Sequence, residues 1–507
     1  MSLLSLGGLV VGFATQLILA ALFGAGADMD AYLAATTLPQ FVIAVLVNSL
    51  NYMFIPVFVE HRRREDVDGA WRVAGALMTI GLLALGGVAL IGMVFASPLQ
   101  RMLVPGFAPE TLALAVRMAR ISWPTVLTLG LATLLGGLYQ SHDRFGRAAA
   151  APVLGAVASL AGTLALAPKL GIAGVAVAAL GGSVVQLLLV APLVLREERF
   201  RLTLRDQPEG LRKVLRLALP LLAGAVFSRG ATLVDRYVAS SLSAGSLAHL
   251  GYANRLVTVL VTVIASGLSV TTFVRLSEHA AGGDPALLRG TMAARLRLMW
   301  FLVAPAVTML IALRVEFVAV VFERGRFAAA DTSVVAGLLP WFLVAMIAMA
   351  LGGIVSSAFY ALQDTWTPAA IAVVEVIAYA IYMPWLAARY HASGVALGFA
   401  VYWSVSFGVL CALIWFKTGH HVRRDFLVSL LVTATAAAVA GTAAMLGRVV
   451  APAWCPGALG FGTVVGALAY TAALAGLRSG ELVLMGRALK DRFGGGTMAS
   501  ARRGAEP

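Results

Sequence analysis

Four charged side chains stand inside long apolar segments of this sequence. Arg229, Asp235 and Arg236 fall within segment 214–241, and Arg255 falls early in segment 247–273. A charge at the centre of a membrane costs ~2.5–3.5 kcal/mol on insertion scales. Arg229 and Arg236 share a helical face because they are seven residues apart. We therefore predict that Arg229, Arg236 and Arg255 line a cationic cavity that binds an anionic substrate; the alternative is an internal salt-bridge cluster that only joins two helices.

Two acidic side chains in apolar segments are candidates for ion coupling. Asp235 accompanies the arginines, and Glu375 lies in segment 368–388. Buried carboxylates of this kind often mark ion or proton pathways. We predict that Asp235 and Glu375 form a sodium or proton site; the alternative is that Glu375 pairs with one of the arginines.

Three polar residues belong to segment 31–58 or directly precede it, namely Asp30, Asn48 and Asn51. We predict that they line the same substrate cavity. The alternatives are that Asp30 only favours the start of a helix, through the helix dipole, and that the asparagines form hydrogen bonds between helices.

The sequence lacks the motifs of common catalytic and nucleotide-binding sites. No GxxxxGK[ST], GxSxG or HExxH is present. The two cysteines, Cys411 and Cys455, form no zinc or haem pattern. We predict that the chain is not an enzyme and has no catalytic residue, no structural metal and no cofactor beyond a coupling cation.

The elements that position these residues are predicted to be membrane helices. The chain has 507 residues, of which 60% are hydrophobic and 12% are charged, about half the charge of a soluble domain. A spanning helix needs ~20 mainly apolar residues. We predict an all-α polytopic membrane protein with fourteen transmembrane helices, near residues 3–23, 31–58, 72–96, 112–139, 149–168, 172–194, 214–241, 247–273, 294–313, 333–361, 368–388, 393–416, 426–446 and 457–477. The first is interpreted as a membrane helix rather than a signal peptide.

The basic residues are distributed unevenly between the loops. If the N-terminus lies in the cytoplasm, 26 of the 38 basic residues fall in cytoplasmic segments. This asymmetry is the positive-inside pattern of membrane proteins. We therefore predict that both termini are cytoplasmic, and that the net charge of +14 reflects membrane topology rather than nucleic-acid binding.

The sequence contains an internal repeat with a period of about 220 residues. Segment 139–149 resembles 360–370, and Gly174-Val-Ala176 recurs as Gly394-Val-Ala396. One period covers six predicted spans, so both copies have the same orientation and form a parallel repeat. We predict a six-helix lobe at 1–195, a basic cytoplasmic linker at 196–216, a second six-helix lobe at 217–418, two further helices at 419–478, and a cytoplasmic amphipathic segment and tail at 479–507. Two equal lobes around a cavity are typical of alternating-access transporters.

Several short motifs resemble those of the MurJ (MviN) lipid II flippases of the MOP transporter superfamily. They are Leu22-Phe-Gly-Ala-Gly26, Asp30-Ala-Tyr32-Leu33, Pro105-Gly-Phe107, Gly251-Tyr-Ala-Asn-Arg255 and Gly325-Arg-Phe327. The resemblance implies a V-shaped pair of lobes with the last two helices forming a lipid-facing groove. It implies export of a polyprenyl-pyrophosphate-linked saccharide across the bacterial inner membrane for peptidoglycan synthesis and cell shape, driven by ion or voltage gradients. The implied partners are that substrate, membrane lipids and cell-envelope synthesis proteins.

The sequence departs from this family in its first lobe. The family pattern Gly-Phe-Ala-Arg reads Gly12-Phe-Ala-Thr15, and a basic pair after Leu38-Pro39 is replaced by apolar residues, whereas Arg255 matches a family arginine. Either the cationic groups have moved to the second lobe or the substrate differs. The alternative function is a Wzx-type or exopolysaccharide flippase. A MATE-like exporter, for which we expect an acidic cavity, and a non-transporting scaffold are the weaker alternatives.

Overall fold

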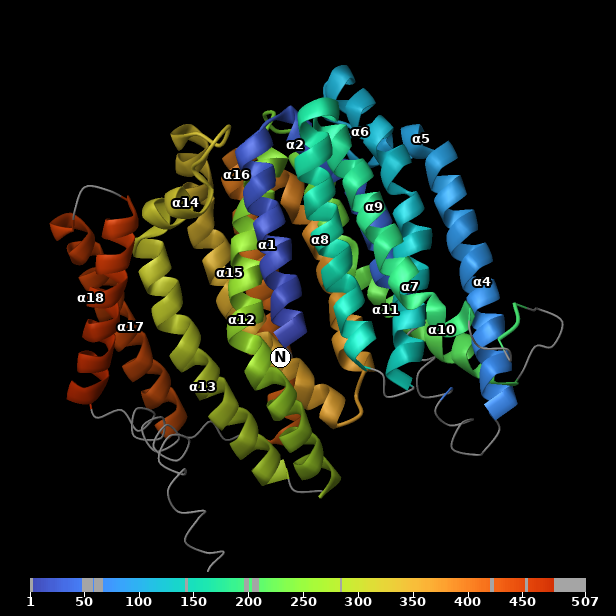
Figure 1. Ribbon diagram of the computed structural model, residues 1–507. Helices are drawn as coiled ribbons and strands as arrows, with labels where there is room; N and C mark the ends of the chain where they lie inside the picture. The colour runs from blue at the N-terminus through green and yellow to red at the C-terminus, as the bar shows by residue number, and fades with distance from the viewer. Residues whose placement is uncertain are drawn as a thin grey trace, which may run out of the picture. The chain divides into compact units, whose positions relative to one another are not determined.

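The computed structural model describes residues 3–47, 58, 67–141, 145–195, 200–202, 209–282, 285–419, 424–451 and 455–477. All regular secondary structure in these ranges is helical (Figure 1), which confirms the predicted all-α class. In chain order the elements are α1 (Leu3–Phe23), α2 (Ala27–Val42), the π-helix η1 (Ile43–Val47), α4 (Val67–Val94), α5 (Ala96–Leu103), α6 (Pro109–Ser122), α7 (Pro124–Ser141), α8 (Phe145–Leu170), α9 (Ile172–Val190), α10 (Pro192–Leu195), α11 (Glu209–Ala239), α12 (Ser246–Ala281), α13 (Pro285–Ala312), α14 (Arg314–Phe322), α15 (Ala329–Ala361), α16 (Trp366–Thr418), α17 (Arg424–Val450) and α18 (Cys455–Gly476).

Twelve helical stretches of the described residues are long and apolar enough to cross a membrane. The prediction of a polytopic helical membrane protein is therefore confirmed, whereas the number of fourteen spans stays a prediction. α11 is not among the twelve; it carries Arg229, Asp235 and Arg236. α16 is counted as one stretch and contains two of the predicted spans.

Two of the long stretches are interrupted, and local backbone chemistry explains where. His391 has φ 52° and ψ −135°, which interrupts α16 between the predicted spans 368–388 and 393–416. α6 and α7 form another long stretch and are separated only at Trp123. Pro124 begins α7, as expected for a residue whose missing N–H costs nothing in the first turn of a helix. The long apolar run of α16 in the sequence therefore hides the kink at His391.

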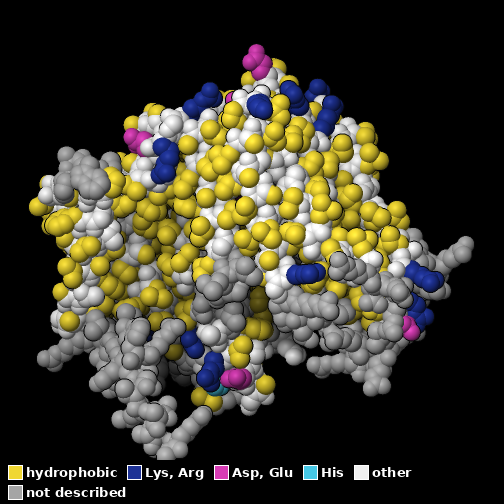
Figure 2. Space-filling view, in the orientation of Figure 1, with side chains coloured by type: hydrophobic (Ala, Val, Ile, Leu, Met, Phe, Trp, Pro, Cys, Tyr) yellow, Lys and Arg dark blue, Asp and Glu magenta, His cyan; other side chains and the backbone are white. Residues whose placement is uncertain are grey.

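The surface agrees with a membrane environment. Figure 2 shows hydrophobic side chains along the long stretches of the helices, with Lys, Arg, Asp and Glu near helix ends. Many of the large apolar side chains are exposed, among them Val94, Met102, Ile381 and Val449. In water such surface would be unfavourable, but in a bilayer it contacts lipid.

The chain divides into two compact units. The first comprises residues 1–259, 322–338 and 369–399, and the second comprises 260–321, 339–368 and 400–507. Helices α12, α15 and α16 each contribute to both units. These units are not the same as the lobes that the repeat predicts, and the predicted lobe boundaries stay a prediction.

In the second unit, α13 holds the two last helices. Thr308 Oγ1 donates a hydrogen bond to the Ala437 carbonyl of α17 at 2.7 Å. Tyr470 on α18 donates from its hydroxyl to the Phe301 carbonyl at 2.8 Å. Small residues and hydrogen bonds of this kind join helices within membranes. α17 and α18 also pack against each other (Figure 1), so they form one hairpin fixed to α13.

In the first unit, three chain turns pack backbone against backbone. The Arg326 N–H donates to the Ala21 carbonyl at 2.8 Å, and Tyr252, which is buried, donates its hydroxyl hydrogen bond to the Gly24 carbonyl at 2.9 Å. Gly245 (φ 89°) and Gly325 (φ 61°) leave no room for a Cβ, which would lie 2.2 Å from the Ala25 and Ala21 carbonyl oxygens respectively. A left-handed backbone at such a contact requires glycine. Several motifs that carry the family resemblance thus lie in these close backbone contacts, which explains why they contain glycine.

Candidate functional site

Arg255 is the clearest candidate for binding an anionic substrate. It lies on α12, three residues after Tyr252, and is half-buried. Its guanidinium reaches α1, because a Cβ built on Gly12 would lie 3.2 Å from Arg255 Nη2. Gly12 stands near the middle of α1, so this charge is placed deep along a membrane helix. Arg255 Nε is buried and has no hydrogen-bond partner in the part of the chain that the structure describes.

Arg236 differs from Arg255 in having acidic neighbours. It is half-buried near the end of α11, and the negative charges of Asp235 and Asp30 both act on it. Its Nε atom is buried without a hydrogen-bond partner among the described residues. Opposite charges at short range largely neutralise each other. Arg236 therefore contributes less free positive charge than Arg255, for which no such acidic neighbour is described.

Asp235 is bound to α16 through a tyrosine. The Tyr379 hydroxyl donates a hydrogen bond to Asp235 Oδ1. Glu375 lies four residues before Tyr379 on α16, so the two side chains occupy one face of that helix. Tyr379, the hydrogen-bond partner of Asp235, therefore shares a helical face with Glu375, the other predicted ion-coupling residue. Tyr379 was not among the predicted site residues: its spacing from Glu375 places both on one helical face, but it does not indicate that Tyr379 reaches Asp235.

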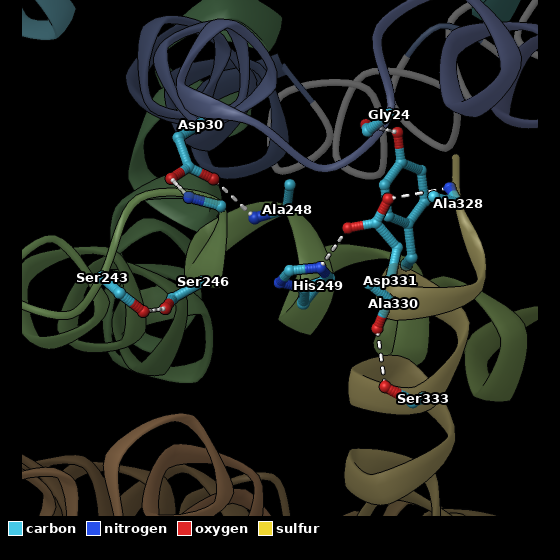
Figure 3. A network of polar contacts seen from close by, with 12 residues as sticks. Gly24, Asp30, Ser243, Ser246, Ala248, His249, Ala328, Ala330, Asp331 and Ser333 are labelled. Carbon is cyan, nitrogen blue, oxygen red and sulfur yellow. Dashed lines mark hydrogen bonds and ion pairs between the residues drawn. The ribbon is translucent and has the colours of Figure 1, made fainter. Parts of the chain in front are cut away.

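Asp30 has a definite structural contact. Figure 3 shows its carboxylate at the start of α12, where Oδ2 accepts a hydrogen bond from the Gly245 N–H at 2.6 Å and Oδ1 accepts one from the Ala248 N–H at 2.7 Å. A carboxylate at a helix N-terminus satisfies free N–H groups and interacts well with the helix dipole. Asp30 thus links α2 to the helix that carries Arg255. Its predicted role in binding substrate stays a prediction.

A second polar contact at the start of α12 was not predicted. His249 Nε2 lies 2.9 Å from Asp331 Oδ1, and Asp331 Oδ2 accepts a hydrogen bond from the Ala328 N–H at 3.0 Å (Figure 3). Asp331 lies in the first turn of α15. The first turn of α12 is therefore held by α2 on one side and by α15 on another, and this fixes the helix from which Arg255 projects.

The remaining predicted residues have different positions. Arg229 lies on α11, and its side chain is exposed. Asn48 and Asn51 lie outside the described residues. Thr15, which replaces a family arginine, donates its hydroxyl hydrogen bond to the Val11 carbonyl of its own helix at 2.9 Å. Thr15 is one turn from Gly12, so Arg255 occupies space close to the position from which the first-lobe arginine is missing.

The site can bind an anion through Arg255 and can exchange a cation or proton at Asp235. Among the described residues there is no group of three or more His, Cys, Asp or Glu side chains able to hold a metal ion. A guanidinium offers a planar, two-pronged donor that suits phosphate oxygens. Among the described residues, Arg255 has no acidic partner, and this distinguishes it from a member of a structural ion-pair cluster.

Two solved structures of membrane proteins share this fold. A solved structure described as the inward-facing conformation of a multidrug resistance MATE family transporter of that superfamily has a TM-score of 0.72 and 18% identity, and the match covers 82% of this chain and 95% of that one. A solved structure described as lipid II flippase MurJ in an inward closed conformation has a TM-score of 0.79 and 20% identity, and covers 93% of this chain and 97% of that one.

The sequence comparisons identify the family. The family described as lipid II flippase MurJ matches residues 19–465. The lipid II flippase MurJ of Burkholderia cenocepacia is 26% identical over 374 residues, which are 72% of each chain. The chain therefore belongs to the lipid II flippase MurJ family. This confirms the predicted family and places the chain among transporters rather than enzymes, as a multi-pass protein of the bacterial inner membrane.

Proposed function

We propose that this protein is a flippase that moves a polyprenyl-pyrophosphate-linked saccharide, the lipid II type of peptidoglycan precursor, across the inner membrane by alternating access of two six-helix lobes. The observation that carries the proposal is the guanidinium of Arg255, which reaches the middle of α1 without a described acidic partner. Maintaining such a charge inside a membrane is costly. An anionic group of the substrate would neutralise the positive charge of Arg255.

The substrate's pyrophosphate is the group that fits Arg255. Arginine binds phosphate oxygens through two parallel N–H···O bonds, which a lysine does not provide. In this proposal Arg236 and Arg229 on α11 add positive potential along the path, and Asn48 and Asn51 contact the saccharide. Membrane lipids surround the polyprenyl chain, and cell-envelope synthesis proteins supply or take up the substrate.

The proposed driving ion acts at Asp235 and Glu375. Of sodium and a proton, the proton suits the described contacts better, for two reasons. Tyr379 already donates to Asp235, and the positive charge of Arg236 next to it opposes a second cation. A proton neutralises the carboxylate without needing the shell of several oxygen ligands that a hard cation requires.

The proposed orientation places both termini in the cytoplasm. It rests on the 26 of 38 basic residues that this orientation assigns to the cytoplasmic side. The turns at Gly24, Gly245 and Gly325 then face the outer side of the membrane, and the pyrophosphate enters the site from the opposite end of α1.

Complementation tests the proposal. The chain is expressed in a bacterium depleted of its own lipid II flippase, with protein in the membrane measured by immunoblot. We expect growth and normal cell shape with the wild-type chain and lysis with Arg255→Ala at an equal membrane level. Lysis with the wild-type chain at a full membrane level would contradict lipid II as the substrate.

A further inference from the structure

Arg297 on α13 carries a positive charge where α13 meets the start of α17. Its guanidinium carbon lies 5.6 Å from the centre of the Phe426 ring, and Phe426 is in the first turn of α17. One turn further along both helices, Trp300 Nε1 donates a hydrogen bond to the Leu430 carbonyl at 3.1 Å. The two helices belong to the second unit and pack along each other (Figure 1). These contacts define the place of the guanidinium.

In the described part of the chain, no acidic side chain compensates the charge of Arg297. The ion pairs described in this unit involve other residues, and the buried Nε atom of Arg297 has no hydrogen-bond partner among the described residues. The face of the Phe426 ring attracts the cation but carries no net charge. Phe426 also leans toward the start of its helix, which is the positive end of the α17 dipole and disfavours a nearby cation. An anion beside Arg297 would therefore be attracted by the guanidinium and by the helix end.

A second arginine of α13 has the opposite environment. Arg289 donates a hydrogen bond from Nη1 to the carbonyl of Thr418, the last residue of α16. A Cβ built on Gly419 would lie 2.9 Å from the same Nη1 atom. Arg289 therefore stabilises the negative end of the α16 dipole, where a cation is favourable. Arg297 faces the start of a helix instead, so it is the arginine of this pair that needs an external anion.

Arg297 lies at the boundary between the polar and the apolar part of α13. After Arg297, α13 carries no charged residue up to its C-terminus, and α17 carries none from Phe426 to its last turn. Charged side chains at such a boundary reach the lipid headgroups. Leu427 and Leu431, which follow Phe426 on α17, are 51% and 65% exposed, and exposed apolar side chains of a membrane helix contact hydrocarbon. The surroundings of Arg297 therefore match both parts of a phospholipid, the phosphate and the acyl chains.

We propose that Arg297 binds the phosphate of an anionic membrane phospholipid at the start of α17, with the acyl chains of that lipid along the exposed surface of α17. A guanidinium offers phosphate oxygens a two-pronged donor and can stack on an aromatic ring at the same time. Basic positions between membrane helices on the cytoplasmic side are typical headgroup sites. In the proposed orientation the lipid belongs to the cytoplasmic leaflet, and it stabilises the packing of α17 against α13. The site does not depend on which saccharide the protein moves.

Native mass spectrometry of the full chain, titrated with phosphatidylglycerol in detergent, tests the proposal. Arg297→Gln removes the charge, and Arg297→Lys keeps the charge without the planar, two-pronged donor. Arg295→Gln is the matched control, because Arg295 is also half-buried on α13 and lies about 200° around the helix from Arg297. We expect Arg297→Gln to bind the first phosphatidylglycerol about tenfold more weakly, equivalent to ~1.4 kcal/mol. Arg297→Lys should show an intermediate loss, and the control should bind like the wild-type chain.

Several outcomes would overturn the proposal. Unchanged phosphatidylglycerol binding in Arg297→Gln would remove the phosphate contact, and an equal loss in Arg295→Gln would show that the arginines act only through their summed charge. If Arg297→Gln does not fold, wild-type binding by Arg297→Lys would contradict the two-pronged contact. Equal binding of phosphatidylcholine would remove the preference for an anionic lipid. Displacement of phosphatidylglycerol by undecaprenyl phosphate in the wild-type chain, absent in Arg297→Gln, would assign the site to the substrate's lipid instead. Complementation in the depleted strain is a separate readout, so failure here leaves the proposed function standing.

Discussion

Arg255 on α12 and Gly12 on α1 are in direct proximity: a methyl group at Gly12 would lie 3.2 Å from Arg255 Nη2. The absence of a side chain at position 12 therefore makes room for the guanidinium. This relationship joins a helix of the predicted second lobe to a helix of the predicted first lobe within one compact unit. No acidic side chain in the described part of the chain acts on Arg255 at this place.

Substitution of Gly12 should disturb Arg255 without removing it. Gly12→Ala forces the guanidinium to move by a few tenths of an ångström, and Gly12→Val forces it further. We expect transport to fall about tenfold in Gly12→Val, since misplacing a charged hydrogen-bond donor costs ~1–3 kcal/mol. Gly8→Ala is the control, because its Cβ meets only Val153 at 3.5 Å. Equal transport by Gly12→Val and wild type would show that the position of Arg255 does not matter.

Removing the Asp30 carboxylate should loosen the start of α12. Asp30→Ala leaves the Gly245 and Ala248 N–H groups without acceptors, and hydrogen bonds to charged groups contribute ~1.5–3 kcal/mol each. We expect a clear decrease in the melting temperature of the purified protein. Asp28→Ala, an exposed acid in the same turn, should change it little. If the two variants melt alike, the contacts of Asp30 do not stabilise the protein, and a role in substrate binding gains support.

The contact between Asp235 and Tyr379 makes a separate prediction about ion coupling. Asp235→Asn should remove the dependence of transport on the proton gradient, because an amide does not take up a proton. Tyr379→Phe should alter that dependence, because it removes the hydroxyl that donates to Asp235. Tyr382→Phe, which removes a hydroxyl from the same helix, is the control. The measurement is transport into vesicles at varied pH and sodium. A wild-type dependence on sodium at constant pH would contradict the proposed proton coupling.

Asp364, in the turn before α16, and Lys417, in the last turn of α16, form an ion pair that should hold over a wide pH range. Lys417 donates to the Asp364 carboxylate, Thr367 adds two further hydrogen bonds, and together they hold the pKa of Asp364 at about 2. Because this pKa is lowered on folding, the stabilisation is complete above the unfolded pKa of about 4 and is lost as the pH falls through 2. Lys417 is 46% exposed, so the pair contributes only ~0.2–1 kcal/mol.

The corresponding experiment compares melting temperatures of the wild-type chain and Asp364→Asn from pH 5 to 8. We expect a small difference in favour of the wild-type chain that stays constant over this range. A difference that disappears between pH 5 and 8 would show that the carboxylate titrates there and is not held by Lys417.

The sequence was sufficient for the features that depend on composition and pattern. Long apolar runs predicted the membrane helices, and short motifs predicted the family. The cost of a charge in a membrane singled out Arg255 and Asp235. The contacts between distant segments were not predictable in this way. Nothing in the sequence indicates that Arg255 reaches Gly12, or that Tyr379 lies on Asp235, because these depend on how helices pack rather than on local pattern.

Asp30 illustrates the same limit. The sequence indicated that Asp30 lies near a helix start. Its carboxylate, however, accepts hydrogen bonds at the N-terminus of α12, more than 200 residues away in the chain, rather than at that of its own helix α2. The sequence predicted a gap between two spans near His391, and the structure has a kink with non-helical backbone at that residue. In both cases the local sequence correctly indicated where a helix starts or is interrupted, whereas the contacts between helices depend on tertiary packing.

The most direct test of the central claim is the appearance of lipid II at the outer face of the membrane. In cells depleted of their own flippase, labelling of lipid II by an external reagent is measured with the wild-type chain, with Arg255→Ala and with Arg255→Lys, at equal membrane levels. We predict labelling with the wild-type chain, none with Arg255→Ala and partial labelling with Arg255→Lys. Normal labelling with Arg255→Ala would contradict the claim that this guanidinium binds the pyrophosphate during transport.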